Sequence, residues 1–193
     1  MNRRTFAVLL AIAGMVSGCI SQGPRPDDEA LIAPATRFVV PIPASANGSL
    51  GIAQSIVAHY RDRTFTFEAQ IQTSPGKFDL AALDGLGRRA LTVHWSAGKM
   101  DFTAAPWLPP VVTPADVLAD IAIIYGPRDA TARAIAKSGG TVTETPTSLT
   151  ISENNHELIV VEYGKGDGWN RAATMRNFAF GYELDIQSRQ ISP

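Results

Sequence analysis

Residue types that carry out enzymatic chemistry are present in this chain, but not at the spacings that such chemistry requires. The histidines His59, His94 and His156 lie far apart, and no pair of them has the spacing of a metal-binding motif. No serine lies in a G-x-S-x-G nucleophile motif. Asp79 and Asp84 could act as an acid–base pair, although strand alternation and a turn explain them more simply. We therefore expect a protein that is not an enzyme and that has no catalytic residue, metal site or cofactor.

Cys19 is the single cysteine of the chain, and its neighbours indicate a reaction that is performed on it. It follows Val16-Ser17-Gly18, and this segment resembles the lipobox of bacterial lipoproteins. The resemblance implies that the thiol is alkylated, that the chain is cleaved after Gly18, and that Cys19 becomes lipidated with three acyl chains. Several chains anchor a protein stably where one would be marginal. The alternative is an ordinary secretory peptide, which would export a lone thiol to an oxidising compartment.

Residues 1–18 have the pattern of a signal peptide. Arg3 and Arg4 form a basic start, and the apolar stretch from Phe6 to Val16 is too short to cross a bilayer. Ile20 follows the cysteine, at the position where lipoproteins of the enteric type carry an aspartate when they stay in the inner membrane. The resemblance therefore implies an outer-membrane lipoprotein that faces the periplasm, with the membrane as its partner through the acyl chains.

The rest of the chain divides into a tether and one domain. Residues 19–35 are rich in proline and acidic residues, so we expect a disordered tether that holds the domain away from the membrane. We expect the domain to span residues 36–193. Loss of Arg3 and Arg4 leaves 15 of the 17 basic residues against 18 acidic ones, a net charge near −3. This charge argues against nucleic acid as a partner.

Alternating hydrophobic and polar residues predict an antiparallel sheet in the domain. In Thr64–Gln72 every second residue is apolar, and Leu91, Val93 and Trp95 alternate with polar residues in the same way. Later in the chain we expect a strand over Leu158–Tyr163, then a loose loop through the glycines of 164–168. A last pair of strands is predicted over Thr174–Phe180 and Tyr182–Gln187.

Two helices are predicted to interrupt the strands. Thr113-Pro114-Ala115-Asp116 is a helix start, an apolar stripe follows, and Gly126-Pro127 ends it. A second short helix is predicted over Ala130–Lys137. Strands, two helices and further strands together predict an α+β fold, in which the helices cover one face of an antiparallel sheet.

Several segments resemble LolB-like proteins of the LolA/LolB group. They are Phe78-Asp79-Leu80, Leu86-Gly87-Arg88-Arg89, Leu91-Thr92-Val93, the helix from Thr113 to Gly126-Pro127, and Phe180 to Ile186. The chain is more similar still, over about residues 36–190, to an uncharacterised bacterial lipoprotein family catalogued as a domain of unknown function. Its members are often encoded among aryl polyene biosynthesis genes. The resemblance implies a curved antiparallel sheet, an incomplete LolB-like β-barrel, with a two-helix lid on one face and an apolar hollow for acyl chains.

The resemblance also implies candidate site residues. The apolar cavity would be lined by Phe65, Phe67, Ile71, Leu91, Val93 and Trp95 on the sheet and by Val117, Leu118, Ile121 and Ile124 on the helix. The same residues would also face inward in a solid core. Trp107 and Leu108, in a loop bounded by prolines, are candidates for a membrane or cargo contact, unless this loop folds back onto the core.

Two functions remain open. The first is a lipoprotein that binds a lipid, an acyl chain or a lipoprotein cargo in its cavity, possible partners being that cargo and a periplasmic carrier of the LolA type. The second is a structural or scaffolding lipoprotein of an envelope assembly, whose sheet is fully packed and binds no ligand.

Overall fold

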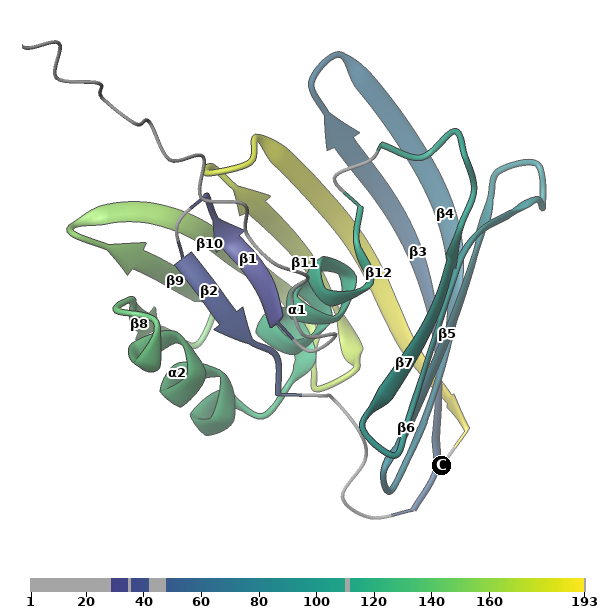
Figure 1. Ribbon diagram of the computed structural model, residues 1–193, viewed down its shortest axis with the longest axis horizontal. Helices are drawn as coiled ribbons and strands as arrows, with labels where there is room; N and C mark the ends of the chain where they lie inside the picture. Colours follow the sequence, from purple (N-terminus) through teal and green to yellow (C-terminus); the bar gives the residue numbers. More distant parts are fainter. Residues whose placement is uncertain (1–28, 35, 42–47, 110–111, 193) are drawn as a thin grey trace, which may run out of the picture.

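The computed structural model describes residues 29–34, 36–41, 48–109 and 112–192 (Figure 1). The predicted signal peptide, Cys19 and residues 20–28 of the predicted tether lie outside the described residues. Among the described residues, no helix is sufficiently long and apolar to cross a membrane.

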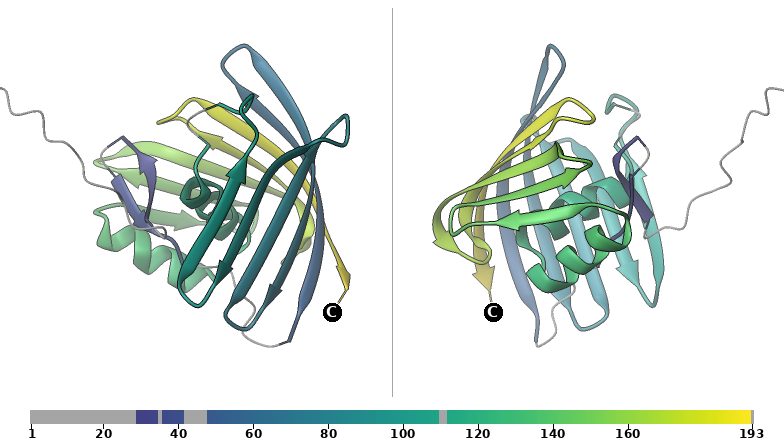
Figure 2. Two further views of the ribbon diagram at one scale, coloured as in Figure 1. Left: turned by 45° about the vertical axis from the view of Figure 1, so that its right-hand side comes forward. Right: turned by 90° about the vertical axis from the view of Figure 1, so that its left-hand side faces the viewer.

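A ten-stranded antiparallel sheet is the framework of the described domain. In spatial order its strands are β7 (Lys99–Ala104), β6 (Arg89–Ser96), β5 (Lys77–Asp84), β4 (Arg63–Ser74), β3 (Leu50–Tyr60), β12 (Tyr182–Ser192), β11 (Asn170–Asn177), β10 (His156–Asp167), β9 (Ser148–Glu153) and β8 (Thr141–Glu144). Pairing of β3 with β12 joins the two halves of the chain. The sheet curves but stays open, because β7 and β8 at its two ends do not pair (Figures 1 and 2).

Both helices lie on the concave side of this sheet (Figure 2). Helix α1 (Pro114–Tyr125) begins where predicted, since the Thr113 side chain accepts a hydrogen bond from the Asp116 amide and a proline fills the first turn. Helix α2 (Arg128–Lys137) starts two residues before the predicted Ala130 and packs against β8 and β2. The predicted α+β fold, a curved antiparallel sheet with two helices on one face, is therefore confirmed.

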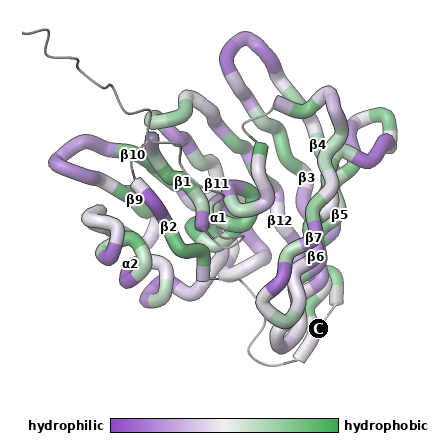
Figure 3. The backbone as a smooth tube through the Cα atoms, viewed as in Figure 1, coloured by the Kyte–Doolittle hydropathy of each residue, from purple (hydrophilic) through white to green (hydrophobic). Residues whose placement is uncertain are grey.

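The pattern of alternating residues identified β4 correctly. Along this strand Phe65, Phe67, Ala69 and Ile71 are half-buried or buried, and the residues between them are exposed. The tube in Figure 3 shows the same contrast, because hydrophobic stretches follow α1 and the neighbouring strands, whereas the tip of the β3–β4 hairpin is hydrophilic. A one-sided strand of this kind has one face toward a core and one toward water.

The amino-terminal boundary of the domain differs from the prediction. Residues 29–34, which we expected in a disordered tether ending at residue 35, include strand β1 (Glu29–Ala33), which pairs with β2 (Thr36–Val39). Ala30 and Ile32 are fully buried, and the Leu31 amide donates a hydrogen bond to the Asp116 carboxylate of α1. The short apolar run in this segment is therefore part of the domain core.

The glycines of residues 164–168 do not form the expected loop. Strand β10 continues through Gly164 and Gly166 to Asp167, with a register shift in its pairing with β11. Gly166 has a φ of +109°, and a Cβ there would lie 1.8 Å from the Asn170 carbonyl oxygen. Glycine is needed for this bulge in a continuous strand. In consequence β11 spans Asn170–Asn177, earlier than the predicted Thr174–Phe180.

Candidate functional site

A cavity of about 190 Å³ lies between α1 and the concave face of the sheet. Its apolar walls come from alternate residues of five strands, from the loop before α1, and from one side of α1. They are Ile56, Ala58, Phe65, Phe67, Ala69, Leu80, Ala82, Leu91, Leu108, Pro109, Val112, Val117, Ile121, Ile124, Leu184 and Ile186. The polar residues of the lining are Gln54, His59, Tyr60, Asp116, Asp120, Tyr125 and Tyr182. No residue of α2 belongs to the lining.

Six of the ten residues proposed from the sequence lie on the cavity wall: Phe65, Phe67, Leu91, Val117, Ile121 and Ile124. In the pairing of β4 with β3, Phe67 is opposite Ile56 and Phe65 is opposite Ala58. The rings of Phe65 and Phe67 stack with centroids 6.3 Å apart, so that together they form an aromatic wall.

The other four residues lie outside the lining. Ile71 and Val93 flank Leu80 in one cross-strand row, and both are 1% exposed. They close the hollow next to the row formed by Ala69, Ala82 and Leu91. Trp95 lies one row further away and packs against the core. Leu118 is fully buried, because the turn of about 100° per helical residue directs it to the flank of α1. The cavity is thus shorter along the strands than the alternating pattern suggested.

Trp107 and Leu108 fold back onto the sheet. Leu108 is 9% exposed and contributes to the cavity wall. The Trp107 ring stacks on Phe67 with centroids 6.4 Å apart, and the Arg88 guanidinium lies 5.5 Å from its centroid. The described part of this loop therefore closes one side of the hollow.

An acidic residue within the apolar wall escaped the sequence analysis. The Asp120 side chain lines the cavity from α1 and accepts a hydrogen bond from the Tyr182 hydroxyl of β12, at 2.8 Å. Asn177 in turn donates to the Tyr182 oxygen, at 3.3 Å. Burial, reinforced by the nearby charge of Asp116, raises the pKa of Asp120 to about 8. The only signal in the sequence was an acidic residue interrupting the apolar stripe of the predicted helix.

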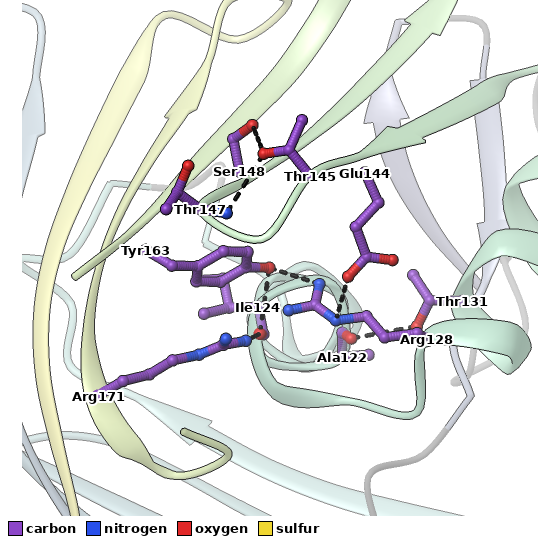
Figure 4. A network of polar contacts seen from close by, with 10 residues as sticks. All are labelled: Ala122, Ile124, Arg128, Thr131, Glu144, Thr145, Thr147, Ser148, Tyr163 and Arg171. Carbon is purple, nitrogen blue, oxygen red and sulfur yellow. Dashed lines mark hydrogen bonds and ion pairs between the residues drawn. The ribbon is translucent and has the colours of Figure 1, made fainter. Parts of the chain in front are cut away.

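A second polar cluster fastens the carboxyl end of α1 (Figure 4). The Arg171 guanidinium donates to the Ile124 carbonyl at 3.2 Å and lies over the Tyr163 ring, 3.7 Å from its centroid. Arg128 stacks over the same ring and pairs with Glu144 at 3.1 Å. Cations at this end of a helix stabilise its unpaired carbonyls, so this cluster has a structural role in holding the cavity roof.

Beside the cavity, His59, Glu183 and Asp185 bring one potential metal ligand each within 4.8 Å of one another. Glu183 is already paired with Arg176, at 2.7 Å, and all three side chains are partly exposed. His94 hydrogen-bonds Asp79 on the solvent-facing side of β6 and β5. These contacts are those of an ordinary polar sheet surface.

Comparison with known proteins identifies one family and several solved structures. The family described as "Protein of unknown function (DUF3261)" matches residues 51–190. No curated protein matches the sequence. A LolA superfamily protein from Nitrosomonas europaea is similar at 9% identity and a TM-score of 0.41, over 76% of this chain and 86% of that one. A putative outer membrane lipoprotein-sorting protein domain from Vibrio parahaemolyticus is similar at 9% identity and a TM-score of 0.40, over 75% and 86% of the two chains.

Proposed function

The chain belongs to the DUF3261 family, and from its cavity we propose that it is a binding protein that holds an acyl chain between α1 and the concave face of its sheet. The observation that carries this proposal is a hollow of about 190 Å³ whose walls are almost entirely apolar. Water gains few hydrogen bonds in such a space, and apolar cavities of about 150 Å³ stay dry and take up hydrocarbon. Filling it with an acyl chain removes apolar surface from water on both partners.

The length of the cavity along β3 suits a linear ligand. Its lining runs along β3 from Gln54 to Tyr60, and strand geometry makes this length about 20 Å. The aromatic wall of Phe65 and Phe67 is half-buried, so part of its surface is available to an occupant. An apolar space of this length suits an extended hydrocarbon chain better than a compact polar molecule.

We propose binding and not catalysis, because polar side chains of the lining are hydrogen-bonded to partners within the fold instead of forming a nucleophile and its base. Gln54 donates to the Ser188 hydroxyl at 3.2 Å, and Asp120 accepts from Tyr182. An acyl-transfer enzyme would need an activated nucleophile within hydrogen-bonding reach of a general base.

The proposal includes a lipid anchor at Cys19, with the domain on the periplasmic side of the outer membrane. Its support is the lipobox-like segment Val16-Ser17-Gly18-Cys19. Glu29, the first residue of β1, follows Cys19 by ten positions, and a fully extended chain of that length spans at most about 35 Å. The cavity would therefore work close to the membrane surface, where a carrier of acyl groups receives or delivers its cargo.

Binding of cis-parinaric acid, a fluorescent fatty acid, tests the proposed function. The chain used is the full-length Cys19→Ala variant, which has no acyl groups of its own, after removal of endogenous lipid. We expect fluorescence to rise and saturate at one probe per chain, because the cavity excludes water, and we expect palmitic acid to displace the probe. If fluorescence does not saturate, the alternative of a ligand-free scaffolding lipoprotein is favoured.

A further inference from the structure

We propose that the Asp120 carboxyl group, positioned by Tyr182, recognises an acyl carbonyl oxygen, so that the ligand of the cavity is a carboxylic acid or an ester and not a plain hydrocarbon. This inference rests on the proposed function and specifies its ligand. Both residues line the cavity, one from α1 and one from β12, and their side chains are in contact with each other at 2.8 Å. Among the described residues, Tyr182 is the one hydrogen-bond partner of the Asp120 side chain.

The pair lies at one end of the hollow. Tyr182 is opposite Tyr60 in the sheet register, next to the hairpin that joins β3 and β4. The rows that follow along the strands are apolar: first Leu184, Ala58 and Phe65, then Ile186, Ile56 and Phe67. Gln54 lies at the other end of the cavity, and its side-chain amide already donates a hydrogen bond to the Ser188 hydroxyl. On the sheet side, the lining therefore changes from polar residues at the Tyr182 end to apolar residues in the next two rows, as an acyl chain with an oxygen-bearing end requires.

The protonation state of Asp120 determines what it can offer a ligand. Burial and the charge of Asp116 on α1 raise the pKa of Asp120 to about 8, although the hydrogen bond from Tyr182 on β12 acts in the opposite direction. Near neutral pH the carboxyl group is therefore mostly protonated. The Oδ1 atom of Asp120 accepts the hydrogen bond from the Tyr182 hydroxyl. The protonated carboxyl group also has an O–H of its own, which it can donate.

An acyl carbonyl oxygen supplies the acceptor that this O–H requires. An alkane in the same place leaves a buried donor without a partner, which costs the desolvation of that group. The expected discrimination between an ester and an alkane of equal length is about tenfold in affinity. Free fatty acids and esters both contain this carbonyl group, and a comparison of their affinities distinguishes the two kinds of ligand.

Competition against cis-parinaric acid at pH 7 measures the discrimination, with palmitic acid, methyl palmitate and hexadecane each presented from cyclodextrin. In the full-length Cys19→Ala background, methyl palmitate should bind about tenfold more tightly than hexadecane. Asp120→Leu should bring the two ligands within about twofold of each other. Asp120→Asn should keep the preference, since its amide still donates a hydrogen bond. Glu183→Gln, beside Tyr182 in the sequence, is the matched control and should behave like the parent.

The pH profile gives a readout that a purely structural role would not affect. Ionisation of Asp120 removes its O–H, so the preference for the ester should fall above about pH 8 in the parent but not in Asp120→Asn. Equal binding of methyl palmitate and hexadecane by the parent would overturn this inference and leave the proposed function standing. If the parent binds neither the three ligands nor the probe, the proposed function itself is overturned. Tighter binding of palmitic acid than of its ester identifies a free acid as the preferred source of the carbonyl.

Discussion

Phe67→Glu is expected to lower the affinity for cis-parinaric acid by at least about a hundredfold. Phe67 lies in the middle of the cavity wall, where its ring stacks between Phe65 and Trp107. A glutamate there would place a carboxylate among the apolar side chains of a cavity that Asp116 and Asp120 also line. An acyl chain in contact with it would remove water from that carboxylate, at a cost of several kcal/mol.

Gln70→Glu is the matched control for this change. It adds the same carboxylate to the same strand, but on the exposed face, opposite Ala53 and Ala81. The affinity of Gln70→Glu for cis-parinaric acid should equal that of the parent chain. Thermal unfolding of both variants by circular dichroism shows whether the sheet is intact. A folded Phe67→Glu chain that binds the probe as tightly as Gln70→Glu would contradict the placement of the ligand against this wall.

Cys19→Ala is expected to move the protein from the membrane fraction to the soluble fraction. The free energy of membrane binding comes from the acyl chains, at about 0.8 kcal/mol for each buried methylene group, and the variant cannot carry them. Fractionation of cells that express the parent or the variant, with separation of inner and outer membranes, measures this change. The parent should be found in the outer membrane and should incorporate labelled palmitate.

Cys19→Ser is the second variant, because it keeps the size and polarity of the side chain but not the thiol. It should be released as completely as Cys19→Ala. If either variant still sediments with outer membranes after a high-salt wash, the anchor does not depend on acylation of this residue.

The parts of the fold that could be predicted from the sequence are those whose pattern is local. Strand β4 follows from its alternating residues, and α1 follows from Thr113, Pro114 and the glycine that ends it. Neither feature needs information about distant partners. Strand β1 was missed because its five residues lie in a segment rich in proline and acidic residues, and only packing against α1 distinguishes it from a tether.

The extent of the cavity could not be predicted, because it depends on which parts of the chain pack over each position of the sheet. Ile71 and Phe67 look equivalent in the sequence of β4, yet Ile71 lies in the packed row with Leu80 and Val93, and Phe67 faces the hollow. Packing against the rest of the fold decides this difference, since Ile71 is covered and Phe67 is only half-buried, and the alternation within one strand contains no information on it.

The pairing of Asp120 with Tyr182 was hidden for the same reason. Sixty-two positions separate the two residues in the sequence, and only the packing of α1 over β12 brings them together. An acidic residue in an apolar helix stripe is a signal that sequence analysis can detect, but its partner and its raised pKa come from the folded chain.

The measurement that tests the acyl-chain cavity most directly is native mass spectrometry of the full-length Cys19→Ala chain, purified from the bacterium without added lipid. We predict a population with one noncovalent adduct, which organic extraction removes and identifies as a fatty acid or an ester, and which is absent from Phe67→Glu but present in Gln70→Glu. A parent chain found only at its bare mass, and still at its bare mass after incubation with palmitic acid or methyl palmitate, would contradict the account.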